Sequence, residues 1–252
     1  MIAVAGGTGR LGSRVVQRLL DRGEAVRVLS RGGADALPAP VEVAAGDVRD
    51  AGGRQRLAVG ASVVVSAITG FPDDSPFEVD RDANAALFEV AASAGADVVF
   101  VSVAQAAPDS ALELARAKFA AEEILRGYGA KWTIVRPDGF VETWTEILEQ
   151  TAGRSGRPMV FGRGDNPFAW LSVDTVADEV TRAVLDPGLR GSTLTVRGPT
   201  PFTLEDLARR VMADHGWQGE PRHLPRAVLH VMGVVPGRTG RMARASLAMD
   251  EV

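Results

Sequence analysis

Met1-Ile-Ala-Val-Ala-Gly-Gly-Thr-Gly-Arg-Leu-Gly12 opens the chain and fixes its fold class. A short β-favouring apolar run leads into a turn with glycines at positions 6, 9 and 12, and an amphipathic helical pattern follows up to Gly23. Glycines at this spacing allow a tight turn, a close backbone approach to a pyrophosphate and close packing of helix on strand. Because backbone N–H groups at a helix start face a bound anion, the stretch predicts a dinucleotide site.

Strand-like and helical stretches alternate over the first half of the chain. The apolar runs at 63–65 and 98–101 are continuous, which is typical of strands covered on both faces of a parallel sheet. We therefore predict a doubly wound α/β fold with a mostly parallel sheet. Its expected strands lie near 1–5, 25–29, 41–45, 62–67, 97–102 and 131–136, and its expected helices near 10–22, 50–59, 76–94 and 109–127.

The pattern becomes irregular beyond Pro137. Residues 1–138 are predicted to form an NADP(H)-binding domain, and residues 139–252 a small substrate lobe interleaved with the last strand and helix of that domain. In this region the sequence predicts strands at 158–161 and 192–197 and a helix at 173–185. It also predicts a helix that begins at Thr203, with Asp206 completing a partial capping box, and a helical tail from Pro221 with Pro225 in its first turn.

Composition excludes several classes of protein. The 252 residues carry a formal charge of −4 and no cysteine, so there is no basic footprint for nucleic acid or an anionic membrane, and no disulfide or thiolate metal site. The three histidines lie eight and seven residues apart, which predicts no metal centre. Without a leader or a membrane-spanning run, we expect a cytoplasmic monomer or homodimer that acts on a small molecule.

The predicted strand ends indicate which cofactor binds. Ser30 and Arg31 end the second strand, where a guanidinium suits a 2′-phosphate, so NADP(H) is favoured over NAD(H); the alternative is a solvated loop arginine. Arg10 could add a second positive charge. Asp47 and Val48 are expected near the adenine. The small residues at 66–70, which include Ala67, Ile68 and Thr69, would let a sugar-phosphate approach.

These motifs together resemble the atypical short-chain dehydrogenases/reductases, specifically the NmrA-like and isoflavone-reductase-like proteins. The matching stretches are Ala5-Gly-Gly-Thr-Gly-Arg-Leu-Gly12, Gly46-Asp-Val48, Val98-Val-Phe-Val-Ser102, Lys118-Phe-Ala-Ala-Glu-Glu-Ile-Leu125, Trp132-Thr-Ile-Val-Arg-Pro-Asp-Gly-Phe140 and Ser172-Val-Asp-Thr-Val-Ala177. The resemblance implies that the backbone from 7 to 12 holds the pyrophosphate, that Lys118 contacts the nicotinamide ribose, and that the turn from 137 to 140 lies near the nicotinamide. The expected cofactor contacts are Gly6, Gly7, Thr8, Gly9, Arg10, Leu11, Gly12, Ser30, Arg31, Asp47, Val48, Ala67, Ile68, Thr69, Ser102, Lys118, Pro137 and Phe140.

The chain departs from the family at the proton donor. Orthodox members carry Tyr-x-x-x-Lys, one helical turn that sets a phenol beside an ammonium, but the residue four before Lys118 is Leu114. The one tyrosine of the chain, Tyr128, follows too late to replace it. Lys118 and Ser102 are the expected catalytic residues, and the alternative for Lys118 is a purely structural contact to the ribose.

Phe140, Trp144, Phe168 and Trp170 are the candidate substrate contacts, with ordinary core packing as the alternative. A pocket lined by these rings would suit a flat apolar compound. We therefore expect an NADPH-dependent oxidoreductase that reduces a small apolar or aromatic carbonyl, quinone or conjugated compound. The alternatives are a non-catalytic regulator that senses NADP(H), and a redox-neutral isomerase or lyase on the same fold.

Overall fold

The computed structural model describes residues 1–32, 37–129 and 131–251. They form two compact units. Unit 1 comprises Met1–Ser110, Leu114–Pro137 and Val173–Val196, and unit 2 comprises Ala111–Glu113, Asp138–Ser172 and Arg197–Val252. The chain thus leaves unit 1 after strand β6 and returns to it for one more helix and strand.

A parallel sheet forms the centre of unit 1. Within the described ranges it has seven strands in the order β3-β2-β1-β4-β5-β6-β9, and every neighbouring pair is parallel. The strands are β1 (Ile2–Ala5), β2 (Val26–Ser30), β3 (Glu42–Ala45), β4 (Val63–Ser66), β5 (Asp97–Val101), β6 (Trp132–Pro137) and β9 (Ser192–Val196). The continuously apolar β4 is buried along its whole length, as expected of a strand covered on both faces.

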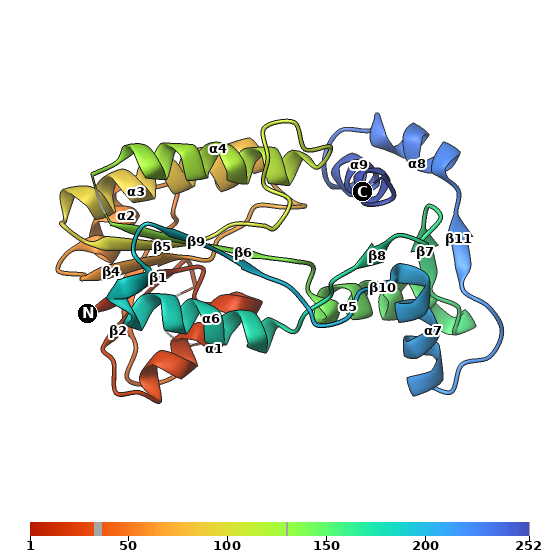
Figure 1. Cartoon of the computed structure of the whole chain (residues 1–252), viewed down its shortest axis with the longest axis horizontal. Helices are drawn as coiled ribbons and strands as arrows, with labels where there is room; N and C mark the ends of the chain where they lie inside the picture. Colours follow the sequence, from red (N-terminus) through yellow and green to blue (C-terminus); the bar gives the residue numbers. More distant parts are fainter. Residues whose placement is uncertain (33–36, 130, 252) are drawn as a thin grey trace. The chain divides into compact units, whose positions relative to one another are not determined.

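Helices cover both faces of this sheet (Figure 1). The helices α2 (Ala51–Ala58), α3 (Asn84–Ser93) and α4 (Glu113–Gly127) lie on one face, and α1 (Arg10–Leu20) and α6 (Val173–Leu185) lie on the other. Arg18 ties α1 to α6 through Asp174 at 2.9 Å and Asp178 at 2.6 Å. The short helix η3 (Pro187–Leu189) precedes β9. The predicted doubly wound α/β fold is confirmed, and every pairing in its sheet is parallel.

The strand order reverses between β1 and β4, which is where ligands bind in open parallel sheets. The glycine turn after β1 and the segment after β4 meet at this point, because Ala67 N donates to Ala5 O at 2.9 Å. The helix predicted at 76–94 begins as a π-helix, η1 (Phe77–Ala83), and continues as α3. Its first turns are therefore wider than the regular periodicity of an α-helix predicts.

Unit 2 is built from short elements. They are α5 (Val141–Ala152), η2 (Gly153–Ser155), β7 (Met159–Phe161), β8 (Pro167–Phe168), β10 (Phe202–Thr203), α7 (Leu204–Asp214), β11 (Arg222–Leu224), α8 (Arg226–Gly233) and α9 (Arg238–Met249). β8 pairs with β10 antiparallel, and β7 pairs with β11 parallel. The capping box of Thr203 and Asp206 forms on both sides.

Two details of unit 2 differ from the sequence prediction. The stretch after Pro137 contains α5, whose 12 residues were not predicted as a helix. Residues 222–224 form a strand, and Pro225 is the N-cap residue of α8, with extended angles of φ −61° and ψ 146°, instead of lying in its first turn. Residues 222–224 pair with β7, which lies more than sixty positions earlier, so no local pattern predicts this strand.

Candidate functional site

The glycine turn after β1 is shaped by close approaches that only glycine permits. Gly6 has φ +84°, and a Cβ added there would lie 2.6 Å from the carbonyl oxygen of Ala67. A Cβ on Gly12 would lie 2.1 Å from the carbonyl oxygen of Gly6, so α1 packs directly on the turn. Gly9 differs, because an added Cβ would have Gly6 O at 3.2 Å as its nearest neighbour. The side of Gly9 that faces away from Gly6 is therefore open to a ligand.

The start of α1 suits an external anion. Its N-cap residue is Gly9, which offers no side-chain cap, and its first turn holds no acidic residue. The first intrahelical bond runs from Ser13 N to Gly9 O, and Gly9 N donates to Gly6 O at 3.0 Å within the turn. Gly7 and Leu11 are buried, whereas Thr8 and Arg10 are exposed beside the turn. Dipole and geometry both favour a phosphate here.

Charged side chains gather where β2 and β3 end. Arg49 donates to Asp47 through its backbone N–H at 2.9 Å and through its guanidinium at 3.0 Å. These hydrogen bonds lower the pKa of Asp47 to about 2. Arg31, whose side chain is largely exposed, has its Nη1 3.7 Å from the same carboxylate. Ser30 is buried, and Val48 packs against the core.

Arg49 also lies near a second carboxylate, since its Nη1 is 3.8 Å from Asp74 Oδ1. The two guanidinium groups at these strand ends suit a phosphate that lies within reach of Arg31 and Arg49. Sequence reasoning identified Arg31 but missed Arg49. Its position two residues after Asp47 is a signal, since Asp side chains often bind the backbone N–H two residues later.

The segment after β4 is held by buried polar side chains of η1 and α3. Gly70 N donates to Asp80 Oδ2 at 3.1 Å, and Ser66 Oγ donates to Asn84 Oδ1 at 2.5 Å. Asp80 and Asn84 are fully buried. Ala67 and Ile68 are half-buried and Thr69 is exposed, so this edge of the switch point offers small side chains and backbone.

Lys118 is buried at the centre of this network. Its Nζ lies 3.1 Å from Asp80 Oδ1, and it donates to the carbonyl oxygens of Ile68 at 2.9 Å and Val101 at 3.1 Å. The ammonium also lies 4.9 Å from the centre of the Phe100 ring. Only 3% of Lys118 is exposed. The ammonium thus makes two hydrogen bonds to carbonyl oxygens and one ion pair with Asp80, and the side chain joins α4 to η1 and to the ends of β4 and β5.

Ser102 belongs to a second buried network. Its hydroxyl donates to Glu122 Oε1 at 2.5 Å, and both residues are almost fully buried. Arg136 donates to both oxygens of the same carboxylate, at 2.8 Å and 2.5 Å, and Arg126 donates at 3.0 Å. Sequence reasoning missed Asp80 and Glu122, because nothing in the order of residues distinguishes a buried acid on a helix from a solvated one.

No tyrosine stands beside Lys118 in the described structure. Leu114 is half-buried one turn earlier on α4. Tyr128 follows the end of α4, ten residues after Lys118, which corresponds to about 15 Å of helix rise. It packs against the core, and burial raises the pKa of its phenol. Pro137, at the end of β6, is buried and accepts a hydrogen bond from Ala104 N at 2.8 Å.

The aromatic candidates lie in unit 2. Trp170 is buried, donates Nε1–H to Phe202 O at 2.8 Å, and has its ring centre 6.0 Å from Trp144 and 5.3 Å from Phe168. Phe140 is the N-cap residue of α5 and forms a bridge with Leu171. Trp170 is thus a core residue of this cluster.

A small pocket opens beside the cluster. Its walls are Trp144, Phe161, Gly164, Asn166, Phe168, Leu204, Ser246, Met249 and Asp250. Trp144 and Phe168 were predicted as substrate contacts and lie in the wall, whereas Phe140 and Trp170 do not. Sequence reasoning missed the residues from α9, which are separated from the aromatic residues by about eighty positions of chain.

Residues 1–32, 37–129 and 131–251 contain no group of three or more His, Cys, Asp or Glu side chains able to hold a metal ion. Among their helices, none is long and apolar enough to cross a bilayer.

Comparison with known proteins identifies relatives of this chain. The family model described as NAD(P)H-binding matches residues 6–187. An NAD(P)H azoreductase of Xenophilus azovorans is 27% identical over 220 residues, which cover 86% of this chain and 74% of that protein. A (4-alkanoyl-5-oxo-2,5-dihydrofuran-3-yl)methyl phosphate reductase of Streptomyces griseus is 30% identical over 250 residues, covering 97% and 81%.

A solved structure shares the fold along the whole chain. It is an NADPH-dependent quinone oxidoreductase of Escherichia coli in complex with NADPH, 21% identical, with a TM-score of 0.81. The match covers 100% of this chain and 89% of the other. At this level of identity the likeness is one of architecture.

Proposed function

We propose that this chain, which belongs to the NAD(P)H-binding family, is an NADPH-dependent reductase of a small apolar or aromatic carbonyl, quinone or other conjugated compound. Membership of the family agrees with the predicted resemblance to atypical NAD(P)-binding reductases. The relatives named as reductases and the quinone oxidoreductase of the same fold support an oxidoreductase activity.

The open side of Gly9, at the switch point of the sheet, is the observation that carries the proposal. The turn leaves room for a group at the positive end of α1, and the residues around it fit a dinucleotide diphosphate. When bound, the reduced nicotinamide supplies a hydride to the acceptor. The chain's own part is to hold the diphosphate at the backbone from Gly7 to Gly12, with Arg10 beside it.

NADP(H) is proposed over NAD(H) on the guanidinium groups at the ends of β2 and β3. Arg31 and Arg49 both lie beside Asp47, and the Arg31 side chain is largely exposed to a ligand. A 2′-phosphate brings negative charge and strong acceptors to this place, whereas a 2′-hydroxyl does not. Asp47 and Val48 are proposed to face the adenine, and Ala67, Ile68 and Thr69 the sugar-phosphate.

The polar networks bear on the kind of acceptor. Lys118 is occupied by Asp80 and two carbonyl oxygens, and Ser102 is occupied by Glu122. We propose that both act by position: Lys118 fixes the strand ends beside the nicotinamide ribose, and Ser102 fixes α4 on β5. An acceptor that spreads the incoming charge over a conjugated system needs no acid side chain at the moment of hydride transfer. The occupation of Lys118 and Ser102 therefore favours quinones and other conjugated compounds over isolated ketones and aldehydes, which are reduced to alcohols.

Substrate contacts are proposed for the aromatic residues of unit 2. Trp144 and Phe168 would face a flat ring from the pocket wall, while Trp170 supports both of them from the core. Phe140 and Pro137 stay proposed contacts of the nicotinamide.

A cytoplasmic location, a monomeric or homodimeric state and the lack of a nucleic-acid partner are proposed on composition alone.

The test is NADPH consumption by the purified chain. We expect loss of absorbance at the nicotinamide band with 1,4-benzoquinone, menadione and an enone, and slower loss with NADH at equal concentration. Binding of NADPH is followed separately by calorimetry. A chain that binds NADPH but consumes none with any acceptor would favour the sensing regulator, and a chain that binds neither nucleotide would refute the cofactor site.

A further inference from the structure

We infer that the pocket of unit 2 is a ring-binding site closed by a latch, the carboxylate of Asp250 at the end of α9, and that this latch limits the size of the ring admitted. The inference rests on the proposed function for the identity of the ring as the hydride acceptor. It adds the part of the chain that controls access, which lies in its last residues.

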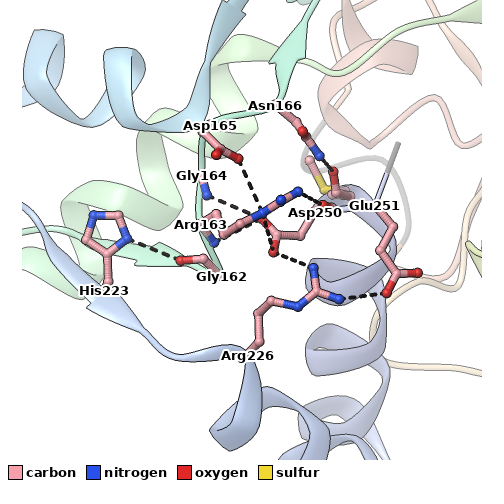
Figure 2. Close-up of polar contacts among 10 residues, drawn as sticks. Gly162, Arg163, Gly164, Asp165, Asn166, His223, Arg226, Asp250 and Glu251 are labelled. Carbon is pink, nitrogen blue, oxygen red and sulfur yellow. Dashed lines mark hydrogen bonds and ion pairs between the residues drawn. The ribbon is translucent and has the colours of Figure 1, made fainter.

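The carboxylate of Asp250 accepts hydrogen bonds from three residues, Arg163, Gly164 and Arg226 (Figure 2). Its Oδ1 accepts from the backbone N–H of Arg163 at 2.9 Å and of Gly164 at 3.3 Å, and its Oδ2 accepts from the Arg226 guanidinium at 2.8 Å. Only 3% of Asp250 is exposed. Two successive amides that converge on one oxygen form an anion-binding concavity, and here the chain fills it with its own carboxylate.

The loop is shaped around this carboxylate. Gly162 has φ +76°, and a Cβ added there would lie 2.7 Å from the carboxyl carbon of Asp250. Gly164 has φ +70°, and its Cβ would lie 2.3 Å from a methyl group of Val160. Both glycines permit left-handed backbone that few other residues adopt. The approach of Asp250 to the loop therefore needs a glycine at position 162.

The end of α9 holds the same loop through its backbone. Met249 O accepts from Asn166 Nδ2 at 3.1 Å, and Asp250 O accepts from Arg163 Nη2 at 2.6 Å. Gly164, Asn166, Met249 and Asp250 all line the pocket. One wall of the pocket is thus made by the contact between loop and helix end, and the wall moves only if these hydrogen bonds break.

The closed pocket is too small for its proposed ligand. Its volume is about 20 Å³, which is room for one water molecule. Its lining is nonetheless rich in rings, from Trp144, Phe161 and Phe168. A flat aromatic ring can enter only after the wall opens. The apparent dissociation constant is then the intrinsic one divided by the fraction of molecules that are open, so the strength of the latch sets the affinity.

The decisive variant is Asp250→Ala, and Glu251→Gln is its matched control. Glu251 also pairs with Arg226, at 2.7 Å, but it makes no hydrogen bond to the loop in the described structure. Binding of 9,10-phenanthrenequinone is measured without NADPH by quenching of tryptophan fluorescence. We expect Asp250→Ala to lower the dissociation constant about tenfold, whereas Glu251→Gln stays within twofold of the parent chain.

Turnover gives the second measurement. Asp250→Ala should lower KM for 9,10-phenanthrenequinone while KM for 1,4-benzoquinone and the dissociation constant of NADPH stay within about twofold. If Asp250→Ala does not fold, Asn166→Ala removes one contact to the helix end and should act in the same direction to a smaller extent. A folded variant with unchanged or weaker binding of the three-ring quinone overturns the latch. Tighter binding of the quinone in a chain that consumes no NADPH supports the latch and refutes the reductase instead.

Discussion

Two glycines of the turn after β1 are expected to have different roles: Gly9 in binding NADPH and Gly12 in the stability of the fold. Gly9 has open space on its outer side, whereas a Cβ on Gly12 would meet the carbonyl oxygen of Gly6 at 2.1 Å. We expect Gly9→Ala to weaken NADPH binding by about tenfold or more, because its methyl group takes the space of the diphosphate. Its cost in free energy of unfolding should stay within about 1 kcal/mol, as for a changed N-cap residue.

Gly12→Ala is the control for that prediction. It should lower the free energy of unfolding by about 1–3 kcal/mol, because the turn and α1 must move apart. Urea unfolding and calorimetry with NADPH measure the two quantities for both variants. Gly9→Ala with unchanged affinity would mean that the diphosphate does not approach this face of the turn.

Single residues also show where local reasoning stops. The spacing of the glycines predicted the turn, because the close backbone contacts that require a glycine there involve residues nearby in the chain. Asp80, Glu122 and Asp250 were not foreseen, since each acid has at least one partner 20 or more positions away: Lys118, Ser102 and the loop at 162–166. A carboxylate that binds distant donors leaves no trace in its own neighbourhood of sequence.

The π-helix η1 and helix α4 are joined by one buried ion pair. Asp80 is 0% exposed and Lys118 is 3% exposed. Lys118 Nζ lies 3.1 Å from Asp80 Oδ1. Replacing Lys118 by Met leaves the Asp80 carboxylate buried without its cation, so we expect a loss of about 3–5 kcal/mol in the free energy of unfolding. Urea unfolding followed by circular dichroism measures the loss.

Two further variants test whether the loss comes from this ion pair. Lys131→Met removes the other lysine of the chain, which is exposed, and should change the free energy of unfolding by no more than about 0.5 kcal/mol. The double variant Lys118→Met with Asp80→Asn should be more stable than Lys118→Met alone, because no buried charge is left over. If the double variant folds and reduces quinones at the parent rate, Lys118 is not a proton donor. If the double variant is no more stable than Lys118→Met alone, the pair is not coupled.

Secondary structure was predictable to different extents in the two units. The central strands β4 and β5 are read from continuous apolar runs, because helices on both sides of a parallel sheet bury both faces of its inner strands. Helix α5 was missed since its buried residues are few, Leu148 and Ala152, and its other side chains are at least partly accessible. The π-helical start of η1 was not predicted from residue periodicity; within it, Asp80 contacts Gly70 and Lys118.

Ligand binding to unit 1 should stabilise the chain as a whole. A ligand held only by the folded state at 100 times its dissociation constant adds about 2.7 kcal/mol, which for a chain of this size raises Tm by roughly 5–10 °C. We expect NADPH to raise Tm more than NADH at equal concentration. Arg31→Ala should remove about 1.5–3 kcal/mol of NADPH binding and leave NADH binding unchanged. Differential scanning fluorimetry with each nucleotide measures both effects.

Arg154→Ala is the control for that comparison, since Arg154 is an exposed arginine of unit 2. Its Tm shifts with NADPH and NADH should match those of the parent chain. Equal shifts with the two nucleotides in the parent chain would contradict the proposed recognition of a 2′-phosphate. Equal losses for both nucleotides in Arg31→Ala would assign Arg31 to another part of the cofactor.

The order of residues alone specified the parallel sheet, the glycine turn and the family, because strand burial, glycine conformation and helix starts are local properties that leave periodic patterns. The tertiary structure decided the rest: the pairing of Asp80 with Lys118, the gathering of Arg31 and Arg49 around Asp47, and the enclosure of Asp250 by the loop from Gly162. These contacts join residues from different strands, helices and loops. Their energy depends on burial and on distances of about 3 Å, and neither quantity exists until the chain has folded.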